Sequence, residues 1–104
     1  MIQTIDKHPP TLEELCARRA EILAVAARSG ASDVGVFGSV ARGDADEASD
    51  VDFLVDLEQG RSLFDLGRLV ADLGDLLGCD VDVVTRAGLR ERVRDRVLSE
   101  TRPL

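Results

Sequence analysis

Aromatic residues are scarce in this sequence of 104 residues, which contains three Phe and neither Tyr nor Trp. Because nucleic-acid bases stack on such rings, we expect no stacking surface. Basic residues are also in the minority, 13 against 20 acidic ones, and the formal net charge is −7. Proteins that bind phosphate backbones carry a basic surface, so no direct nucleic-acid binding is expected.

Cysteine and long apolar runs are lacking as well. Cys16 and Cys79 stand far apart, without a C-x-x-C pair or zinc-ligand spacing, and are interpreted as small buried residues in a reducing compartment. No apolar run approaches the roughly 18 residues of a membrane-spanning helix, and the polar N-terminus carries no signal-peptide pattern. These absences predict a soluble, cytoplasmic protein that binds no membrane.

The composition that remains is typical of one folded domain. Hydrophobic residues make up 44% of the chain, which argues against disorder, and the length fits a single core. Residues 1–10 are predicted to be an N-terminal tail, in which the only histidine, His8, is interpreted as incidental. Residues 11–104 are predicted to be a single domain.

Periodic apolar residues and turn signals divide that domain into helices and strands. A T-x-x-E capping box at Thr11 and an S-x-x-D pattern at Ser62 begin two helices, and Thr85 is predicted to cap the last one. Strands are predicted at 34–37, 50–55 and 80–84. The order helix, strand, strand, helix, strand, helix predicts an α+β domain with a mixed sheet of three or four strands and helices packed on one face.

Carboxylates alternate with apolar residues on the second and third predicted strands. Side chains at i and i+2 share a face, so Asp50 lies with Asp52, and Asp80 with Asp82. Asp is a poor strand former, and like charges on neighbouring strands repel. A bound Mg²⁺ or Mn²⁺ would offset this repulsion, since both ions prefer carboxylate oxygens. The plainer interpretation is a solvent-facing strand whose polar face happens to be acidic.

Gly38 and Ser39 follow a hydrophobic strand and precede a predicted helical turn. Glycine lets a phosphate approach the backbone closely, and the N–H groups at a helix start favour anions. Ser39 adds a hydroxyl donor. A Gly-Ser pair alone fits a simple turn, but beside the strand carboxylates it predicts a nucleoside triphosphate site with a metal platform.

These residues form a motif, G-S-x(10)-D-x-D, from Gly38-Ser39 to Asp50-Val51-Asp52. The motif resembles the signature of the DNA polymerase β-type nucleotidyltransferase superfamily. The longer stretch 37–52 is similar to the minimal nucleotidyltransferases (MNT), which act as antitoxins beside HEPN-domain ribonuclease toxins. The likeness runs from about Val34 to Leu98 and implies the nucleotidyltransferase fold.

The resemblance implies how ATP is held. Gly38 and Ser39 would bind the β- and γ-phosphates. Arg42 would be a further triphosphate contact, although it could instead pair with Asp44 or Asp46.

The resemblance also implies the metal ligands. Asp50 and Asp52 would ligate two Mg²⁺ ions, with Mn²⁺ as an alternative. Asp82 would be the third carboxylate, a ligand of the catalytic metal that helps deprotonate the attacking hydroxyl. Asp80 competes for that position, but it starts the strand and follows a turn, so Asp82 is favoured.

The implied activity is transfer of AMP from ATP to a hydroxyl group of a partner HEPN ribonuclease toxin, an antitoxin function. The acceptor would be a tyrosine, and this chain contains none, so it would lie on the partner. About twenty residues follow the third strand, too few for a substrate domain, so a partner is expected to complete the site. Two alternatives are a non-catalytic antitoxin that acts by direct binding and a nucleotidyltransferase for small molecules.

The C-terminal segment is rich in arginine. One interpretation is a docking face for an acidic partner or RNA. The other is a solvated helix with Glu91–Arg94 and Asp95–Arg92 ion pairs. The arginines concerned are Arg86, Arg90, Arg92, Arg94, Arg96 and Arg102.

Overall fold

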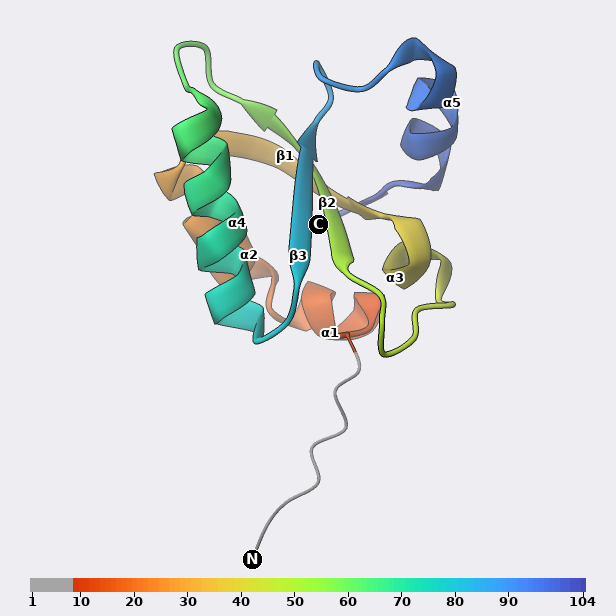
Figure 1. Cartoon of the computed structure of the whole chain (residues 1–104). Helices are drawn as coiled ribbons and strands as arrows, with labels where there is room; N and C mark the ends of the chain where they lie inside the picture. Colours follow the sequence, from red (N-terminus) through yellow and green to blue (C-terminus); the bar gives the residue numbers. More distant parts are fainter. Residues whose placement is uncertain (1–8) are drawn as a thin grey trace, which may run out of the picture.

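The computed structural model of the protein contains one mixed sheet of four strands, which are β1 (Ala31–Phe37), β2 (Val51–Leu57), β3 (Val81–Thr85) and β4 (Arg102–Pro103). The strand order is β3-β2-β1-β4 (Figure 1). β2 pairs parallel with β3 and antiparallel with β1, and β1 pairs antiparallel with β4. The predicted α+β class with a mixed sheet is confirmed.

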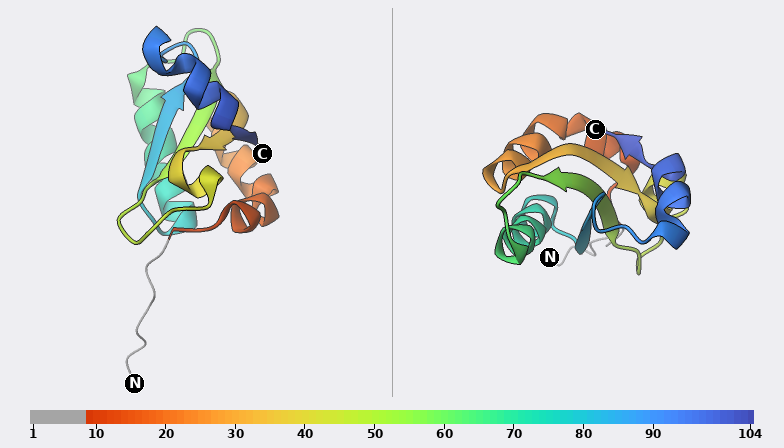
Figure 2. Two further views of the ribbon diagram at one scale, coloured as in Figure 1. Left: turned by 90° about the vertical axis from the view of Figure 1, so that its right-hand side faces the viewer. Right: turned by 90° about the horizontal axis from the view of Figure 1, so that it is seen from above.

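Within residues 9–104, five helices accompany the sheet: α1 (Leu12–Ala17), α2 (Arg19–Arg28), α3 (Gly38–Arg42), α4 (Leu63–Leu77) and α5 (Glu91–Glu100). α2 and α4 contact each other, and they pack on β1 and β3 respectively. α5 contacts α3 and β1 instead. Figures 1 and 2 show α3 and α5 together, on the side of the sheet away from α2 and α4. The helical layer of α2 and α4 leaves the opposite side free for the short α3 and for α5.

The capping patterns in the sequence correctly predict where two of the helices begin. Thr11 and Ser62 form the two capping boxes, with Glu14 and Asp65 as their reciprocal partners. The first predicted helix is interrupted at Arg18, which ends α1 and precedes α2.

The predicted cap at Thr85 is wrong. Thr85 is the last residue of β3, and its hydroxyl accepts a hydrogen bond from the Gly88 N–H within a turn. α5 starts at Glu91 instead, after Arg90, whose side chain makes no capping bond. A Thr can cap a tight turn as well as a helix, so the hydroxyl alone did not distinguish them.

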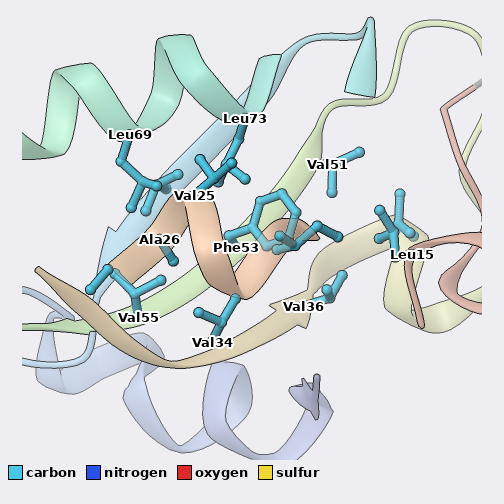
Figure 3. Packing of buried hydrophobic residues seen from close by; sticks show 14 residues of the cluster. Leu15, Val25, Ala26, Val34, Val36, Val51, Phe53, Val55, Leu69 and Leu73 are labelled. Carbon is cyan, nitrogen blue, oxygen red and sulfur yellow. The ribbon is translucent and has the colours of Figure 1, made fainter. Parts of the chain in front are cut away.

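The main core lies between the sheet and the layer of α2 and α4 (Figure 3). Phe53 is its largest fully buried side chain, and Val51 and Val55 lie on the same face of β2. Leu54 points to the other face, where it is buried outside this cluster, as is Val97 of α5. β2 is therefore covered on both faces over its middle.

The structure describes residues 9–104, so most of the predicted tail and His8 lie outside the described residues. Within the described part, Pro9 is buried. No helix of residues 9–104 is both long and apolar enough to span a membrane. Cys16 and Cys79 are both free thiols, but the first is exposed and the second half-buried, so the expected burial is wrong for Cys16.

Truncating the buried ring of Phe53 tests the position of this core. We expect Phe53→Ala to lower the free energy of unfolding by about 3–5 kcal/mol, because it removes apolar contacts and leaves a cavity. Phe64→Ala is the matched control, since the Phe64 side chain is 91% exposed, and we expect a change within about 0.5 kcal/mol. Urea denaturation followed by circular dichroism measures both. Equal losses in the two variants would contradict the core described above.

Candidate active site

The two acidic strands meet in parallel register. Asp52 of β2 is paired directly with Asp82 of β3, so their side chains leave the sheet on the same face. This is the face opposite Val51 and Phe53, away from the main core. The pairing follows from the βαβ connection through α4, which returns the chain to the edge of β2 in the same direction.

The proximity of these acids has an electrostatic consequence. The pKa of Asp52 is raised to about 6, first by burial and then by the negative charges of Asp82 and Asp50. The positive charge of Arg42 acts in the other direction but does not cancel them. The side chain is half-buried, so the ionised form is held at a cost that a bound cation would offset.

Asp50 stands apart from this pair. It precedes β2, so strand alternation does not dictate its direction, and it borders a hollow of about 660 Å³ together with Asp75 and Asp80. Among residues 9–104, no three His, Cys, Asp or Glu side chains lie close enough together to form a metal site. The structure therefore brings Asp52 and Asp82 together, with Asp50 beside them rather than in one ligand cluster.

Asp80 is less well placed than Asp82. It lies before β3, where its carbonyl oxygen accepts the Val51 N–H at 3.0 Å, and its side chain is exposed. Its charge is not among those that raise the pKa of Asp52, whereas that of Asp82 is. This geometry supports the preference for Asp82.

Gly38 brings the backbone against the Asp52 carboxylate. Its φ is +74°, in the left-handed region that glycine tolerates. A Cβ atom at Gly38 would clash with Asp52 Oδ2 and would stand 3.2 Å from Asp52 Cγ. The turn after β1 therefore needs glycine both for its conformation and for the space that the acid occupies.

Arg42 lies at the end of α3, one turn beyond Ser39. Its guanidinium pairs with Asp44 through Nε at 3.2 Å and with Glu100 through Nη1 at 3.3 Å. The predicted alternative partner Asp44 is confirmed, and Asp46 instead accepts hydrogen bonds within its own loop. Arg42 thus stands beside the Gly38 turn, with its charge already paired.

Glu100 is a site residue that the sequence analysis missed. It is the last residue of α5, and its Oε1 accepts the Gly38 N–H at 3.1 Å. The sequence around Gly38 does not indicate this contact, because Gly38 and Glu100 are 62 positions apart. Only a motif spanning both ends of the domain would have revealed it.

The arginines of α5 are not used in the predicted ion pairs. Within the described residues, Glu91 does not pair with Arg94, nor Asp95 with Arg92 within 4.0 Å. These four side chains are exposed. The helix is therefore exposed to solvent, as one interpretation predicted, but the two ion pairs that this interpretation named are not formed.

The donor set fits Mg²⁺ or Mn²⁺. Both ions prefer carboxylate oxygens, and Mg²⁺ is usually held by one or two carboxylates together with substrate phosphates and water. Asp52 and Asp82 supply such a pair of carboxylates on one face of the sheet. Gly38 N–H and Arg42 supply anion-binding groups alongside.

Comparisons with known proteins show the family to which the chain belongs. A family model described as a nucleotidyltransferase domain matches residues 20–104. The protein adenylyltransferase MntA of Thermococcus cleftensis is 43% identical over 94 residues, covering 86% of this chain and 92% of that protein. MJ0435 of Methanocaldococcus jannaschii, named as a candidate protein adenylyltransferase, is 38% identical over 82 residues, covering 79% of this chain and 88% of that protein.

Solved structures give the same fold. One described as a candidate minimal nucleotidyltransferase has a TM-score of 0.81 and 53% identity, and covers 91% of this chain and 97% of that one. A toxin–antitoxin structure with AMP-PNP has a TM-score of 0.70 at 20% identity, covering 81% of this chain and 69% of that one, and is a likeness of fold alone.

The close approach at Gly38 gives one prediction. We expect Gly38→Ala to destabilise the protein more than Gly43→Ala, although both residues have positive φ, +74° and +81°. Both variants strain the backbone by about 1–2 kcal/mol. Only at Gly38 does the added methyl meet a side chain, since no atom lies within 4 Å of a Cβ at Gly43, and overpacking costs about 1–3 kcal/mol more. Thermal or urea unfolding compares them, and equal losses would show that the Asp52 carboxylate does not crowd Gly38.

The crowding of acids gives a second prediction, for protein in chelator. Because the folded-state pKa of Asp52 is about 6 against an ordinary 3.8, the folded protein binds more protons than the unfolded chain between these values. The contribution of Asp52 to stability therefore falls as the pH rises from about 4 to about 6. We expect Asp52→Asn to remove this loss and to melt higher than the unchanged protein at pH 7.

The control for that experiment is Asp95→Asn, an exposed acid on α5. Its melting temperature should follow the unchanged protein across the pH range. If Asp52→Asn melts lower than the unchanged protein at pH 7 in chelator, Asp52 stabilises the fold and the electrostatic description is wrong.

Proposed function

The chain belongs to the nucleotidyltransferase domain family and is a nucleotidyltransferase, and on this premise we propose that it transfers AMP from ATP to a hydroxyl group of a partner toxin. The single observation that carries this proposal is the paired Asp52 and Asp82 beside the Gly38 turn. Carboxylates for a divalent ion and backbone for a triphosphate then lie side by side. The name of the similar MntA protein, a protein adenylyltransferase, supports the choice of a protein acceptor.

The triphosphate would be held by the turn after β1. The Gly38 N–H would donate to a phosphate oxygen, the Ser39 hydroxyl would add a donor, and Arg42 would neutralise negative charge. Ser39 is half-buried and is the second residue of α3, directly after Gly38. Arginine suits phosphate because its planar guanidinium presents paired donors.

Asp52 and Asp82, with Asp50 beside them, would hold Mg²⁺ or Mn²⁺, two ions in our proposal. When bound, the metal would neutralise the triphosphate and lower the pKa of the attacking hydroxyl. These carboxylates lie on the face of the sheet away from the core, so they would hold the ions next to the phosphate donors.

The reaction is an in-line displacement at the α-phosphorus of ATP. The acceptor oxygen forms the new O–P bond, the bond from the α-phosphorus to pyrophosphate breaks, and pyrophosphate leaves with the electron pair. The hydroxyl proton passes to Asp82, whose side chain is exposed and can release it to solvent. Asp82 would then serve as both metal ligand and proton acceptor.

The acceptor, in our proposal, is a tyrosine of a HEPN-domain ribonuclease toxin in the cytoplasm. This chain has no Tyr, so the modified tyrosine must belong to the partner. AMP on that residue would inactivate the toxin, which makes the protein an antitoxin that acts by turnover.

The test is mass spectrometry of an intact candidate toxin, a HEPN-domain protein that binds this chain, after incubation with this protein, Mg²⁺ and ATP. We expect the toxin to gain the mass of AMP and lose ribonuclease activity at substoichiometric amounts of this protein. The double variant Asp50→Asn/Asp52→Asn should add no AMP, because the ions that neutralise the triphosphate are no longer held.

The matched control is Asp72→Asn/Asp95→Asn, which removes two negative charges from helices away from the strand carboxylates. It should modify the toxin as the unchanged protein does. If the toxin mass never changes while a one-to-one mixture is inactive, the protein neutralises by binding alone. Modification of a small molecule but not of the toxin would favour the third possibility.

A further inference from the structure

An acidic side chain occupies the anion-binding groups of the site. Glu100 Oε1 accepts the Gly38 N–H at 3.1 Å, and both of its oxygens lie within 3.4 Å of Arg42 Nη1. Its side chain is only 20% exposed. The two groups that we assign to the triphosphate are therefore already bound to one carboxylate of the same chain.

This placement is electrostatically unfavourable in two respects. Glu100 ends α5, where the carbonyl end of the helix carries partial negative charge, and no basic residue occupies the last turn. Its negative charge also contributes, as the smallest of the causes, to the raised pKa of Asp52. A carboxylate in such surroundings needs the Gly38 N–H and Arg42 to hold it there.

The contact is not needed to hold the end of α5. The Thr101 hydroxyl donates to the Val97 carbonyl at 2.6 Å, and the Thr101 methyl group packs against Gly35 of β1. Val97 is buried, and the following β4 pairs with β1. The backbone at position 100 is thus anchored by its neighbours, and its side chain can leave Gly38 without unfolding the helix.

We propose that Glu100 is an internal competitor of the nucleotide, whose carboxylate occupies the phosphate-binding groups until a triphosphate displaces it. The inference rests on the proposed function in assigning Gly38 and Arg42 to the triphosphate. A polyphosphate carries more charge than one carboxylate, and with its metal ions it neutralises Asp52 and Asp82 rather than repelling them. Glu100 would thereby prevent weaker anions from binding to the Gly38 N–H and Arg42, and would lower the affinity for ATP.

The size of the effect follows from occupancy. If Glu100 occupies the groups nine-tenths of the time, the apparent dissociation constant of a competing phosphate is raised about tenfold. Glu100→Gln keeps the shape of the side chain and removes its charge, so the fold should persist. We expect this variant to bind inorganic tripolyphosphate and Mg²⁺–ATP about tenfold more tightly than the unchanged protein in isothermal titration calorimetry.

Two matched variants separate the proposal from a general effect of charge. Glu91→Gln makes the same change at the other, exposed end of α5, and Asp44→Asn frees Arg42 from its exposed partner without touching Gly38. Both should change the affinity much less than Glu100→Gln. The excess for Glu100→Gln should persist at 0.5 M NaCl, since direct competition for the same donors is screened less than distant charge.

The binding affinities of the three variants decide between the proposal and its alternatives. The proposal is supported if Glu100→Gln binds more tightly than the unchanged protein and the other two variants do not. The same holds if Glu100→Gln binds measurably while the unchanged protein binds too weakly to measure. Equal gains in all three variants would mean a general charge effect and would overturn it. Weaker binding by Glu100→Gln would show that Glu100 positions the Gly38 turn for the nucleotide, and would overturn it while leaving the proposed function intact. If neither protein binds Mg²⁺–ATP, both the inference and the proposed function fail.

Discussion

The parallel pairing of β2 with β3 is the constraint on which the rest of the site depends. It places Asp52 and Asp82 at the same level of the sheet and on the same face. Parallel strands need a crossover, and α4 supplies it while its apolar side closes the core over Leu69 and Leu73. One connection therefore builds the core on one face and gathers the acids on the other.

The parallel pairing brings like charges together, and this repulsion contributes to the electrostatics of the site. A carboxylate that is half-buried and close to two other acids is harder to ionise, so the pKa of Asp52 is raised, first by burial and then by those charges. Close-by cationic groups are few, and Arg42 is shared between Asp44 and Glu100. The negative charges of Asp82, Asp50 and Glu100 around Asp52 outnumber the positive charge of Arg42, which fits the proposed binding of divalent ions with a nucleotide.

The turn after β1 is held between this acidic face and α5. On one side Gly38 lies against Asp52, and on the other its N–H is bonded to Glu100. A change in occupancy of the metal or phosphate positions would therefore be felt at the end of α5. The exposed arginines of α5, Arg92, Arg94 and Arg96, lie about one to two turns before Glu100. Within the described residues they make no ion pair, so the proposed nucleotide site and this basic stretch share one helix.

Sequence by itself determined the local and repetitive features. The capping boxes at Thr11 and Ser62, the alternation around Asp52 and the Gly38-Ser39 motif depend on neighbours within a few positions, so their chemistry is readable in the chain. Tertiary structure alone decided which acids meet. Asp50 lies before the strand, where alternation does not fix its direction, and register between β2 and β3 set Asp82 beside Asp52. Glu100 joined the site because α5 folds back over β1, a contact that depends on packing across 62 positions rather than on any local preference.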